Sequence, residues 1–200
     1  MMFKKICVIF LFLLFISSFI GFVSAVTVNG VDFNLTKEYL GGENKTDGYQ
    51  VNNTFGIFCI DDMMPQKIGF WDRESDYSED LEIGNHPVRY YYSYNKYVSD
   101  NMSHAYFTSG DSFYEIFWVG NNITPDIEKL IRNTPDSKID SDSFYSIVNE
   151  SIDTYVQSRN ERLNYDSQYN YYESRSSQQD NSKGYNDEKI RELLITYYHP

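Results

Sequence analysis

The sequence predicts an α+β fold, in which an antiparallel sheet of about six to eight short strands precedes two or three helices. Residues 26–119 are rich in Val, Ile, Phe and Tyr, which favour strands. From residue 124 onward, the apolar residues recur at helical spacing, so the C-terminal half is expected to be helical. Because the strands come first, we expect the helices to cover one face of the sheet.

The first 25 residues have the pattern of a signal peptide. Lys4 and Lys5 precede an apolar run, and the small residues Val23 and Ala25 occupy the −3 and −1 positions of a cleavage site. Cleavage before Val26 would give a secreted or cell-surface protein. The alternative is an uncleaved N-terminal anchor, because residues 6–23 reach the lower limit of about 18 residues for a membrane span.

Four segments are expected along the chain. The signal peptide, residues 1–25, precedes an acidic α+β domain, residues 26–156. Residues 157–186 are dominated by Asn, Ser, Gln, Tyr, Arg and Asp, which predicts a polar flexible linker or a frayed helix. Residues 187–200 are expected to form an amphipathic helix, which is too short to be stable alone and therefore docks on the domain, a partner or a surface.

The strands follow from composition and turn signals. Residues 26–35 read as a hairpin about Asn29-Gly30, a dipeptide typical of two-residue turns. Residues 103–119 read as a second hairpin, turning at residues 109–111. The other expected strands are residues 54–60, 67–71 and 86–98.

The helices follow from caps and apolar stripes. Thr124 is the expected N-cap of a helix that has Pro125 at its first position. A second helix is expected from the apolar face of residues 142–157. The members of that face are Phe144, Ile147, Val148, Ile152, Tyr155 and Val156.

The order of these segments resembles that of the PsbP-like α+β sandwich. The opening "NGVDFNL", the following "EYLGG", the meander ending in "FYEIFWV" and the helix "DIEKLI" carry the resemblance, which covers residues 26–134. Thr36 stands where that family usually has a proline. The composition also resembles that of exported proteins of methanogenic archaea. The first resemblance implies partner binding, and the second implies the cell envelope or the medium.

Charge and cysteine content exclude several classes of protein. Removing Lys4 and Lys5 leaves 15 basic against 29 acidic residues, a net charge of −14, which repels nucleic acid. After cleavage only Cys59 remains, so the domain has no intramolecular disulfide. The sequence also contains no P-loop, dinucleotide-binding fingerprint or metalloprotease motif.

The acidic stretch 71–82 is the first candidate site. Counted from Asp72 as an EF-hand loop, position 6 is Tyr77 instead of Gly and position 12 is Ile83 instead of Glu. The stretch is therefore an irregular calcium site, a catalytic carboxylate cluster, or a solvated turn or helix start. Calcium is the only cofactor that the sequence suggests. Its candidate ligands are Asp72, Glu74, Asp76, Glu79, Asp80 and Glu82.

Cys59 offers an enzymatic alternative. A cysteine nucleophile needs a histidine to form its thiolate, and His86 or His104 could supply one. A cysteine-dependent hydrolase is therefore the competing hypothesis. The other interpretation is a core cysteine, because Cys59 alternates with Phe55 and Ile57 along an expected strand.

Six N-x-S/T triplets agree with export and are candidate glycosylation sites. They begin at Asn34, Asn44, Asn52, Asn101, Asn122 and Asn149.

Nineteen tyrosines are the last prominent feature. Tyr90, Tyr92 and Tyr94 share one face of an expected strand, where they pack in a sheet or contact a protein or sugar. The leading hypothesis is an exported, non-enzymatic binding protein that recognises another protein, a cell-wall glycan or a cation.

Overall fold

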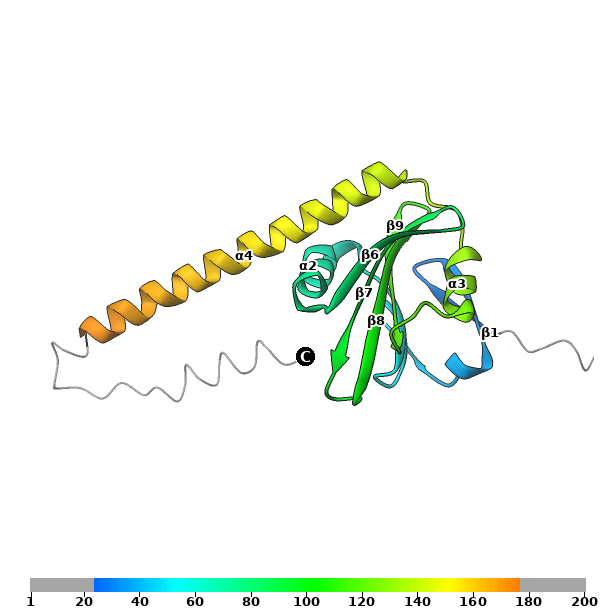
Figure 1. Cartoon of the computed structure of the whole chain (residues 1–200), viewed down its shortest axis with the longest axis horizontal. Helices are drawn as coiled ribbons and strands as arrows, with labels where there is room; N and C mark the ends of the chain where they lie inside the picture. The colour runs from blue at the N-terminus through cyan, green and yellow to red at the C-terminus, as the bar shows by residue number, and fades with distance from the viewer. Residues whose placement is uncertain (1–23, 177–200) are drawn as a thin grey trace, which may run out of the picture. The chain divides into compact units, whose positions relative to one another are not determined.

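The computed structural model describes residues 24–176, with side chains as far as residue 166, and confirms the α+β fold. The described residues form a seven-stranded antiparallel sheet, a two-stranded hairpin and three α-helices (Figure 1). The hairpin consists of β1 (Ser24–Val28) and β2 (Val31–Leu35). The large sheet has the order β3-β4-β5-β9-β8-β7-β6. Its strands are β3 (Glu43–Lys45), β4 (Gly48–Val51), β5 (Phe55–Cys59), β6 (Tyr77–Ile83), β7 (His86–Asn95), β8 (Asp100–Ser109) and β9 (Ser112–Val119).

The first hairpin turns at Asn29-Gly30, as the sequence predicts. Asn29 has φ 46° and Gly30 has φ 78°, the left-handed conformation that a two-residue hairpin turn requires and that this dipeptide tolerates. Phe33 and Leu35 point inward from β2 and are almost completely buried. The hairpin therefore packs its apolar side on the sheet, and a short 3₁₀ turn, η1 (Lys37–Tyr39), follows it.

A helix replaces one of the expected strands. Residues 67–71 belong to α2 (Met64–Glu74), which follows the 3₁₀ turn η2 (Asp61–Met63). Pro65 occupies the first turn of α2, where its missing N–H is harmless, and Ile68 points into the core. A short apolar run does not distinguish a strand from one buried face of a helix, which explains the error. α2 carries the chain from β5, next to the central strand β9, to β6 at the edge of the sheet.

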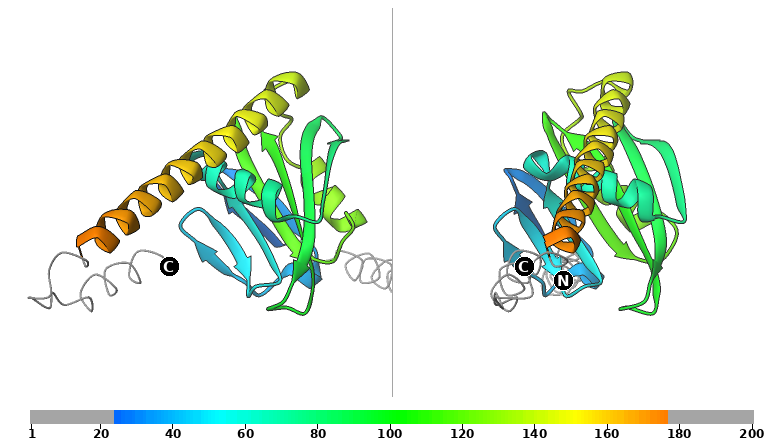
Figure 2. Two further views of the ribbon diagram at one scale, coloured as in Figure 1. Left: turned by 60° about the vertical axis from the view of Figure 1, so that its left-hand side comes forward. Right: turned by 90° about the vertical axis from the view of Figure 1, so that its left-hand side faces the viewer.

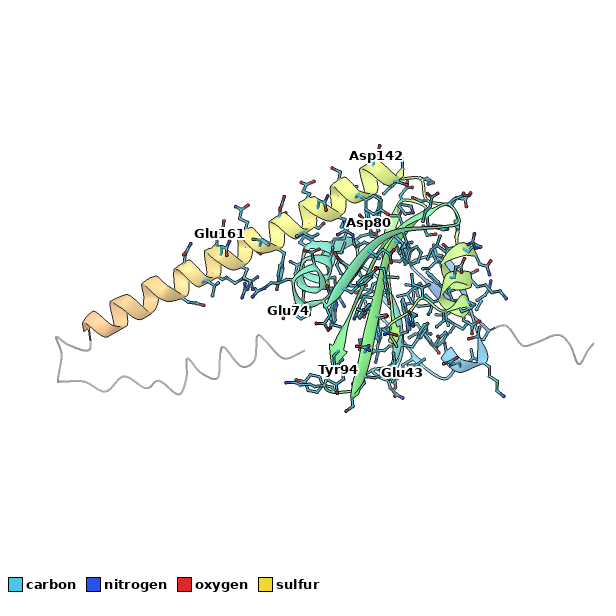
Figure 3. All side chains as sticks on the ribbon, viewed as in Figure 1. Glu43, Glu74, Asp80, Tyr94, Asp142 and Glu161 are labelled. Carbon is cyan, nitrogen blue, oxygen red and sulfur yellow. The ribbon has the colours of Figure 1, made fainter. Side chains whose placement is uncertain are left out.

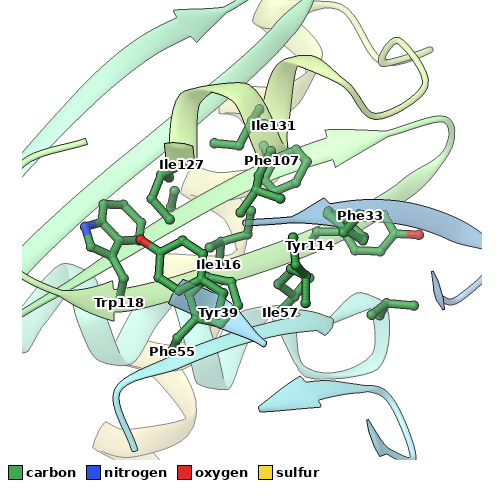
Figure 4. Packing of buried hydrophobic residues seen from close by; sticks show 14 of the residues in the cluster. Phe33, Tyr39, Phe55, Ile57, Phe107, Tyr114, Ile116, Trp118, Ile127 and Ile131 are labelled. Carbon is green, nitrogen blue, oxygen red and sulfur yellow. The ribbon is translucent and has the colours of Figure 1, made fainter. Parts of the chain in front are cut away.

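Helices cover both faces of the sheet, not one as expected (Figures 1 and 2). On the first face, the hairpin β1–β2 and helix α3 (Pro125–Arg132) enclose a core in which Ile127 and Ile131 meet Phe107 and Ile116 (Figure 4). On the second face, α2 and the first turns of α4 (Ser141–Ser176) pack on the sheet. The members of this second core are Ile60, Met64, Ile68, Tyr91, Tyr106, Phe113, Phe144 and Val148.

The expected cap of α3 is present, and the expected stripe of α4 is buried in its first turns, whereas its last member, Val156, is 45% exposed. The Thr124 hydroxyl accepts a hydrogen bond from the Ile127 N–H at 3.3 Å, which caps α3. Phe144 and Val148 are fully buried on the stripe of α4. Gly69 of α2 lies so close to Tyr155 of α4 that an added methyl group would overlap the tyrosine Cβ.

The chain divides into two compact units at Val156–Gln157. α4 extends to Ser176, and thus through part of the segment expected to be a linker or frayed helix. Within the second unit, Gln157 donates to Glu161 at 3.0 Å, and Leu163 and Tyr165 are exposed. The expected helix 187–200 and nearly all of the expected signal peptide lie outside the described residues. Within residues 24–176, no helix is both long and apolar enough to cross a membrane.

Candidate binding site

Tyrosines from two neighbouring strands meet on the first face, at the edge of the sheet. Tyr90 and Tyr92 lie two residues apart on β7 and therefore point to the same side. Tyr77 of β6 is paired directly with Tyr92 and shares that side. The strand register thus gathers three phenol rings.

The three rings pack against one another. The rings of Tyr77 and Tyr92 stack with centroids 5.1 Å apart and planes at 20°. The ring of Tyr90 meets Tyr77 edge-on at 6.3 Å. Tyr90 is nearly buried and shares a 2.9 Å hydrogen bond with the Ser103 hydroxyl, and burial raises the pKa of its phenol. Tyr90 is therefore a rigidly held, buried ring that packs against the more exposed Tyr77.

A hollow of about 310 Å³ opens at these tyrosines. A second hollow, of about 490 Å³, lies beside Cys59 at the other end of the sheet. The volume at the tyrosines is at the lower end of the roughly 300–1,000 Å³ of small-molecule sites. The lining of the tyrosine hollow consists of Tyr77, Glu79, Leu81, Tyr90, Tyr92, Asn121, Asn122 and Ile123. The hollow thus combines aromatic and aliphatic surface with one carboxylate and two amides.

Glu79 is the only charged side chain in this lining. It accepts a hydrogen bond from the Tyr77 hydroxyl at 2.9 Å, which raises the pKa of Tyr77. The phenol remains a proton donor at neutral pH, and the second carboxylate oxygen can accept from a ligand.

Trp118 of β9 holds the loop that forms the other wall of the hollow. Its indole stacks on Tyr90 with centroids 5.9 Å apart and planes at 15°. Its Nε1–H donates to the Asn122 carbonyl at 3.0 Å. The loop that presents Asn121 and Asn122 is therefore tied to the same aromatic core as the tyrosines.

A second group of polar residues is buried under α2 on the opposite face. Glu115 of β9 is 1% exposed and accepts hydrogen bonds from His104 Nδ1 at 2.8 Å and from the Tyr106 hydroxyl at 2.9 Å. Lys67 of α2 places its ammonium group 3.0 Å from the other carboxylate oxygen of Glu115. Trp71 stacks on His104 at 3.8 Å. These contacts close the cluster beneath the helix.

The electrostatics of this buried cluster keep Glu115 ionised. Burial alone raises the pKa of Glu115, but the hydrogen bond from His104 and the charge of Lys67 outweigh it and lower the pKa to about 2. Burial also lowers the pKa of His104, whose Nε2 is buried without a hydrogen-bond partner. The cluster joins α2 to the sheet and has no open surface at its carboxylate.

The acidic stretch 71–82 is neither one turn nor one cluster, because it covers the end of α2 and strand β6. Arg89 pairs with Asp80 on one side and with Asp72 on the other, at 3.6 Å. Asp76 accepts from the Tyr94 backbone N–H, and Glu79 belongs to the tyrosine hollow on the other face. The described part of the chain contains no group of three or more His, Cys, Asp or Glu able to hold a metal ion. The calcium candidates Asp72, Glu74, Asp76, Glu79, Asp80 and Glu82 are therefore not assembled into one site.

Neither candidate histidine reaches Cys59. Cys59 packs on the first face with the hairpin, whereas His104 lies on the second face under Trp71. His86 is fully buried, with Nδ1 2.7 Å from the Thr108 carbonyl and Nε2 3.4 Å from the Thr134 hydroxyl.

The surroundings of Cys59 also differ from those of a nucleophile. Its thiol is 3.4 Å from Asp61 and 3.3 Å from Asn29 in a hollow with three aspartates and no histidine. Burial raises the pKa of this thiol, and the charge of Asp61 acts in the same direction. These contacts do not assemble a thiolate–imidazole pair.

The six sequon asparagines all lie within the described residues. Asn101 is half-buried, and the other five are exposed: Asn34, Asn44, Asn52, Asn122 and Asn149. Asn122 differs from the rest because it also lines the tyrosine hollow.

Sequence reasoning found the alternation of Tyr90, Tyr92 and Tyr94 but not their partners Tyr77 and Glu79, because residues 77–83 were not expected to form a strand. It also missed Glu115. One signal was present: Glu115 is the only charged residue within the otherwise apolar "FYEIFWV", so an inward carboxylate there requires a buried partner.

Comparisons with protein-family models, curated proteins and solved structures found no match to this chain.

Proposed function

We propose that this chain is an exported, non-enzymatic binding protein whose domain binds carbohydrate in the tyrosine hollow. The observation that carries the proposal is the lining itself, in which phenol rings stand beside one carboxylate and two amides. A sugar ring presents C–H groups on its faces and hydroxyls at its edge. The rings of Tyr77 and Tyr92 suit the former, and Glu79, Asn121 and Asn122 suit the latter.

Charge supports a ligand without negative groups. The whole chain carries a net charge of −12, and the hollow contains Glu79 but no Lys or Arg. This negative charge would repel an anionic ligand, and the lining has no cation to pair with it. Neutral sugars can donate hydrogen bonds to Glu79 without electrostatic repulsion.

The fold also supports a preformed site. Tyr90 is held by Ser103 and Trp118, and the backbone carbonyl of Asn122 is held by Trp118, so the Tyr90 ring and the loop backbone need little ordering when a ligand binds. Preorganisation of this kind favours affinity because less side-chain entropy is lost.

The experiment uses Trp118 as the reporter. Trp71, the other tryptophan, lies on the opposite face and is changed to Phe so that emission comes from beside the hollow alone. A panel of neutral mono- and disaccharides is titrated into this Trp71→Phe protein. We expect saturable changes in Trp118 emission that Tyr77→Leu weakens about tenfold.

Phe70→Leu is the matched control. Phe70 is 43% exposed and Tyr77 is 40% exposed, but Phe70 lies on α2, away from the hollow. Its loss should leave the affinity unchanged. The proposal fails when no saccharide alters Trp118 emission, or when Tyr77→Leu and Phe70→Leu weaken binding equally.

A further inference from the structure

The tyrosines of β7 continue beyond the hollow. Tyr94 follows Tyr92 at the next position on the same side of the strand. It is 62% exposed and lies towards the tip of the hairpin formed by β7 and β8 (Figure 3). Tyr90, Tyr92 and Tyr94 thus form a row, here called the tyrosine ladder, that runs from the floor of the hollow into solvent.

The ladder follows the two-residue repeat of a strand. Alternate residues of a strand are roughly 6.5–7 Å apart, and the ring centroids of Tyr90 and Tyr92 are 6.1 Å apart. A linear polysaccharide presents sugar faces at a comparable repeat. One ring in the hollow therefore leaves the next ring of the chain close to Tyr94.

Backbone contacts fix the outer end of the ladder. The Tyr94 N–H donates to Asp76 Oδ2 at 3.0 Å, which ties this end of β7 to the segment before β6. Across the other edge, Tyr94 is paired with Asn101 of β8. Tyr94 is thus an exposed ring on a held backbone with an amide beside it, as in the hollow.

The charges along the ladder restrict the ligand. The carboxylate of Glu79 flanks it on the same face. The ammonium group of Lys96 lies beyond it, 5.2 Å from the ring centroid of Tyr97. An acidic polysaccharide would meet the carboxylate of Glu79 before any cation, so an uncharged chain fits better.

We infer that the ligand is a linear, uncharged polysaccharide that lies along β7, with one sugar in the hollow and the next on Tyr94. The inference rests on the proposed function and adds to it a second subsite and a polymeric ligand class. Tyr94 contributes stacking area to the second sugar, and the Asn101 amide offers hydrogen-bond partners for its hydroxyls.

Oligosaccharides of increasing length test the inference. Cello- and chito-oligosaccharides of one to six units are titrated into the full mature chain by calorimetry and Trp118 emission. We expect affinity to rise about tenfold between the shortest oligomer that binds and the one that is longer by two units. Tyr94→Ala should abolish that rise and leave the affinity for the short oligomer unchanged. Phe70→Ala is the control and should retain the rise.

The outcomes separate the two proposals. Absence of binding by every oligomer overturns the proposed function and the inference with it. Equal affinity for short and long oligomers overturns the inference alone and leaves the hollow as the site. The inference is also overturned when Tyr94→Ala weakens all lengths equally, or when acidic oligogalacturonates bind more tightly than the neutral series.

Discussion

The ammonium group of Lys67 lies 3.0 Å from the carboxylate of Glu115, although Lys67 belongs to a helix and Glu115 to β9, the central strand of the sheet. Glu115 is 1% exposed, while the Lys67 side chain is 36% exposed at the rim of α2. Lys67 therefore neutralises a buried charge and joins α2 to the sheet at one defined position.

Lys67→Met is expected to lower the free energy of unfolding by about 1–3 kcal/mol, because Glu115 keeps its hydrogen bonds but loses its cation. Urea unfolding measures the change. Lys138→Met is the control, since the pair of Lys138 and Asp111 has side chains that are 68% and 73% exposed. That surface pair should contribute about 1 kcal/mol or less. Equal losses in the two variants would contradict the role given to Lys67.

The stability of the domain should fall on acidification. The pKa of Glu115 is about 2 in the fold against an ordinary value of 4.5, so the unfolded chain binds more protons between these values. The contribution is complete above about pH 4.5 and is lost as pH falls towards 2. Its size is about 3 kcal/mol. Glu115→Gln should flatten the pH dependence of the urea midpoint in this window.

His104 should add a separate loss at higher pH. Burial lowers its pKa below the ordinary 6.5, so stability begins to fall as pH drops below about 6.5. This part should persist in Glu115→Gln and disappear in His104→Asn. A midpoint independent of pH between 7 and 5 in the unaltered protein would refute it.

Gly69→Ala tests the close approach of α2 and α4. Alanine favours helices over glycine by about 1 kcal/mol, but its methyl group would overlap the Cβ of Tyr155. We expect a net destabilisation of about 1–3 kcal/mol, measured by thermal unfolding. Gln66→Ala, at an exposed position of the same helix, should be neutral or nearly so. A stabilised Gly69→Ala would show that the helices separate readily.

Cys59 should react slowly. Burial and the neighbouring Asp61 keep the pKa of its thiol above the ordinary value, so little thiolate exists at neutral pH. Iodoacetamide at pH 7.5, followed by mass spectrometry, should label the folded protein more than tenfold slower than the urea-unfolded protein. Faster labelling of the folded state would revive the cysteine-hydrolase hypothesis.

N-glycosylation at Asn122 should block the hollow. Asn122 is exposed and lines it, so a glycan attached in a glycosylating host would occupy the space of a ligand. Saccharide binding should then require Asn122→Gln or enzymatic removal of the glycan. Asn149→Gln is the control, and this change on α4 should not restore saccharide binding. Undiminished binding by protein that mass spectrometry shows to be glycosylated at Asn122 would count against this placement of the ligand.

The local signals in the sequence predicted much of the fold. Asn29-Gly30 and Thr124-Pro125 determine a turn and a helix start through their own backbone preferences, and both are confirmed. Residues 67–71 were assigned wrongly because a short apolar run fits either a strand or a helix face. Whether such a run forms a strand or a helix depends on the residues that it packs against, which here are Glu115 beside Lys67 and Tyr155 beside Gly69.

The candidate site depended even more on long-range pairing. The alternation of Tyr90 and Tyr92 was visible, but only the register between β6 and β7 brings Tyr77 and Glu79 beside them. The same register divides the acidic stretch, since alternate residues of β6 point to opposite faces. A cluster that is continuous in sequence is thus two separate surfaces in space.

The passage of α2 from β5 to the edge strand β6 separates β5 along the chain from its partner β9. Strands β6 to β9 pair with their neighbours in sequence, so this meander can form by itself. β5 pairs with β9, joining Phe55 to Trp118 and Cys59 to Tyr114, and contacts so distant in sequence form slowly. A growing chain that ends before residue 112 leaves β5 without this partner. The two halves of the sheet can be joined only after the last strand has been made.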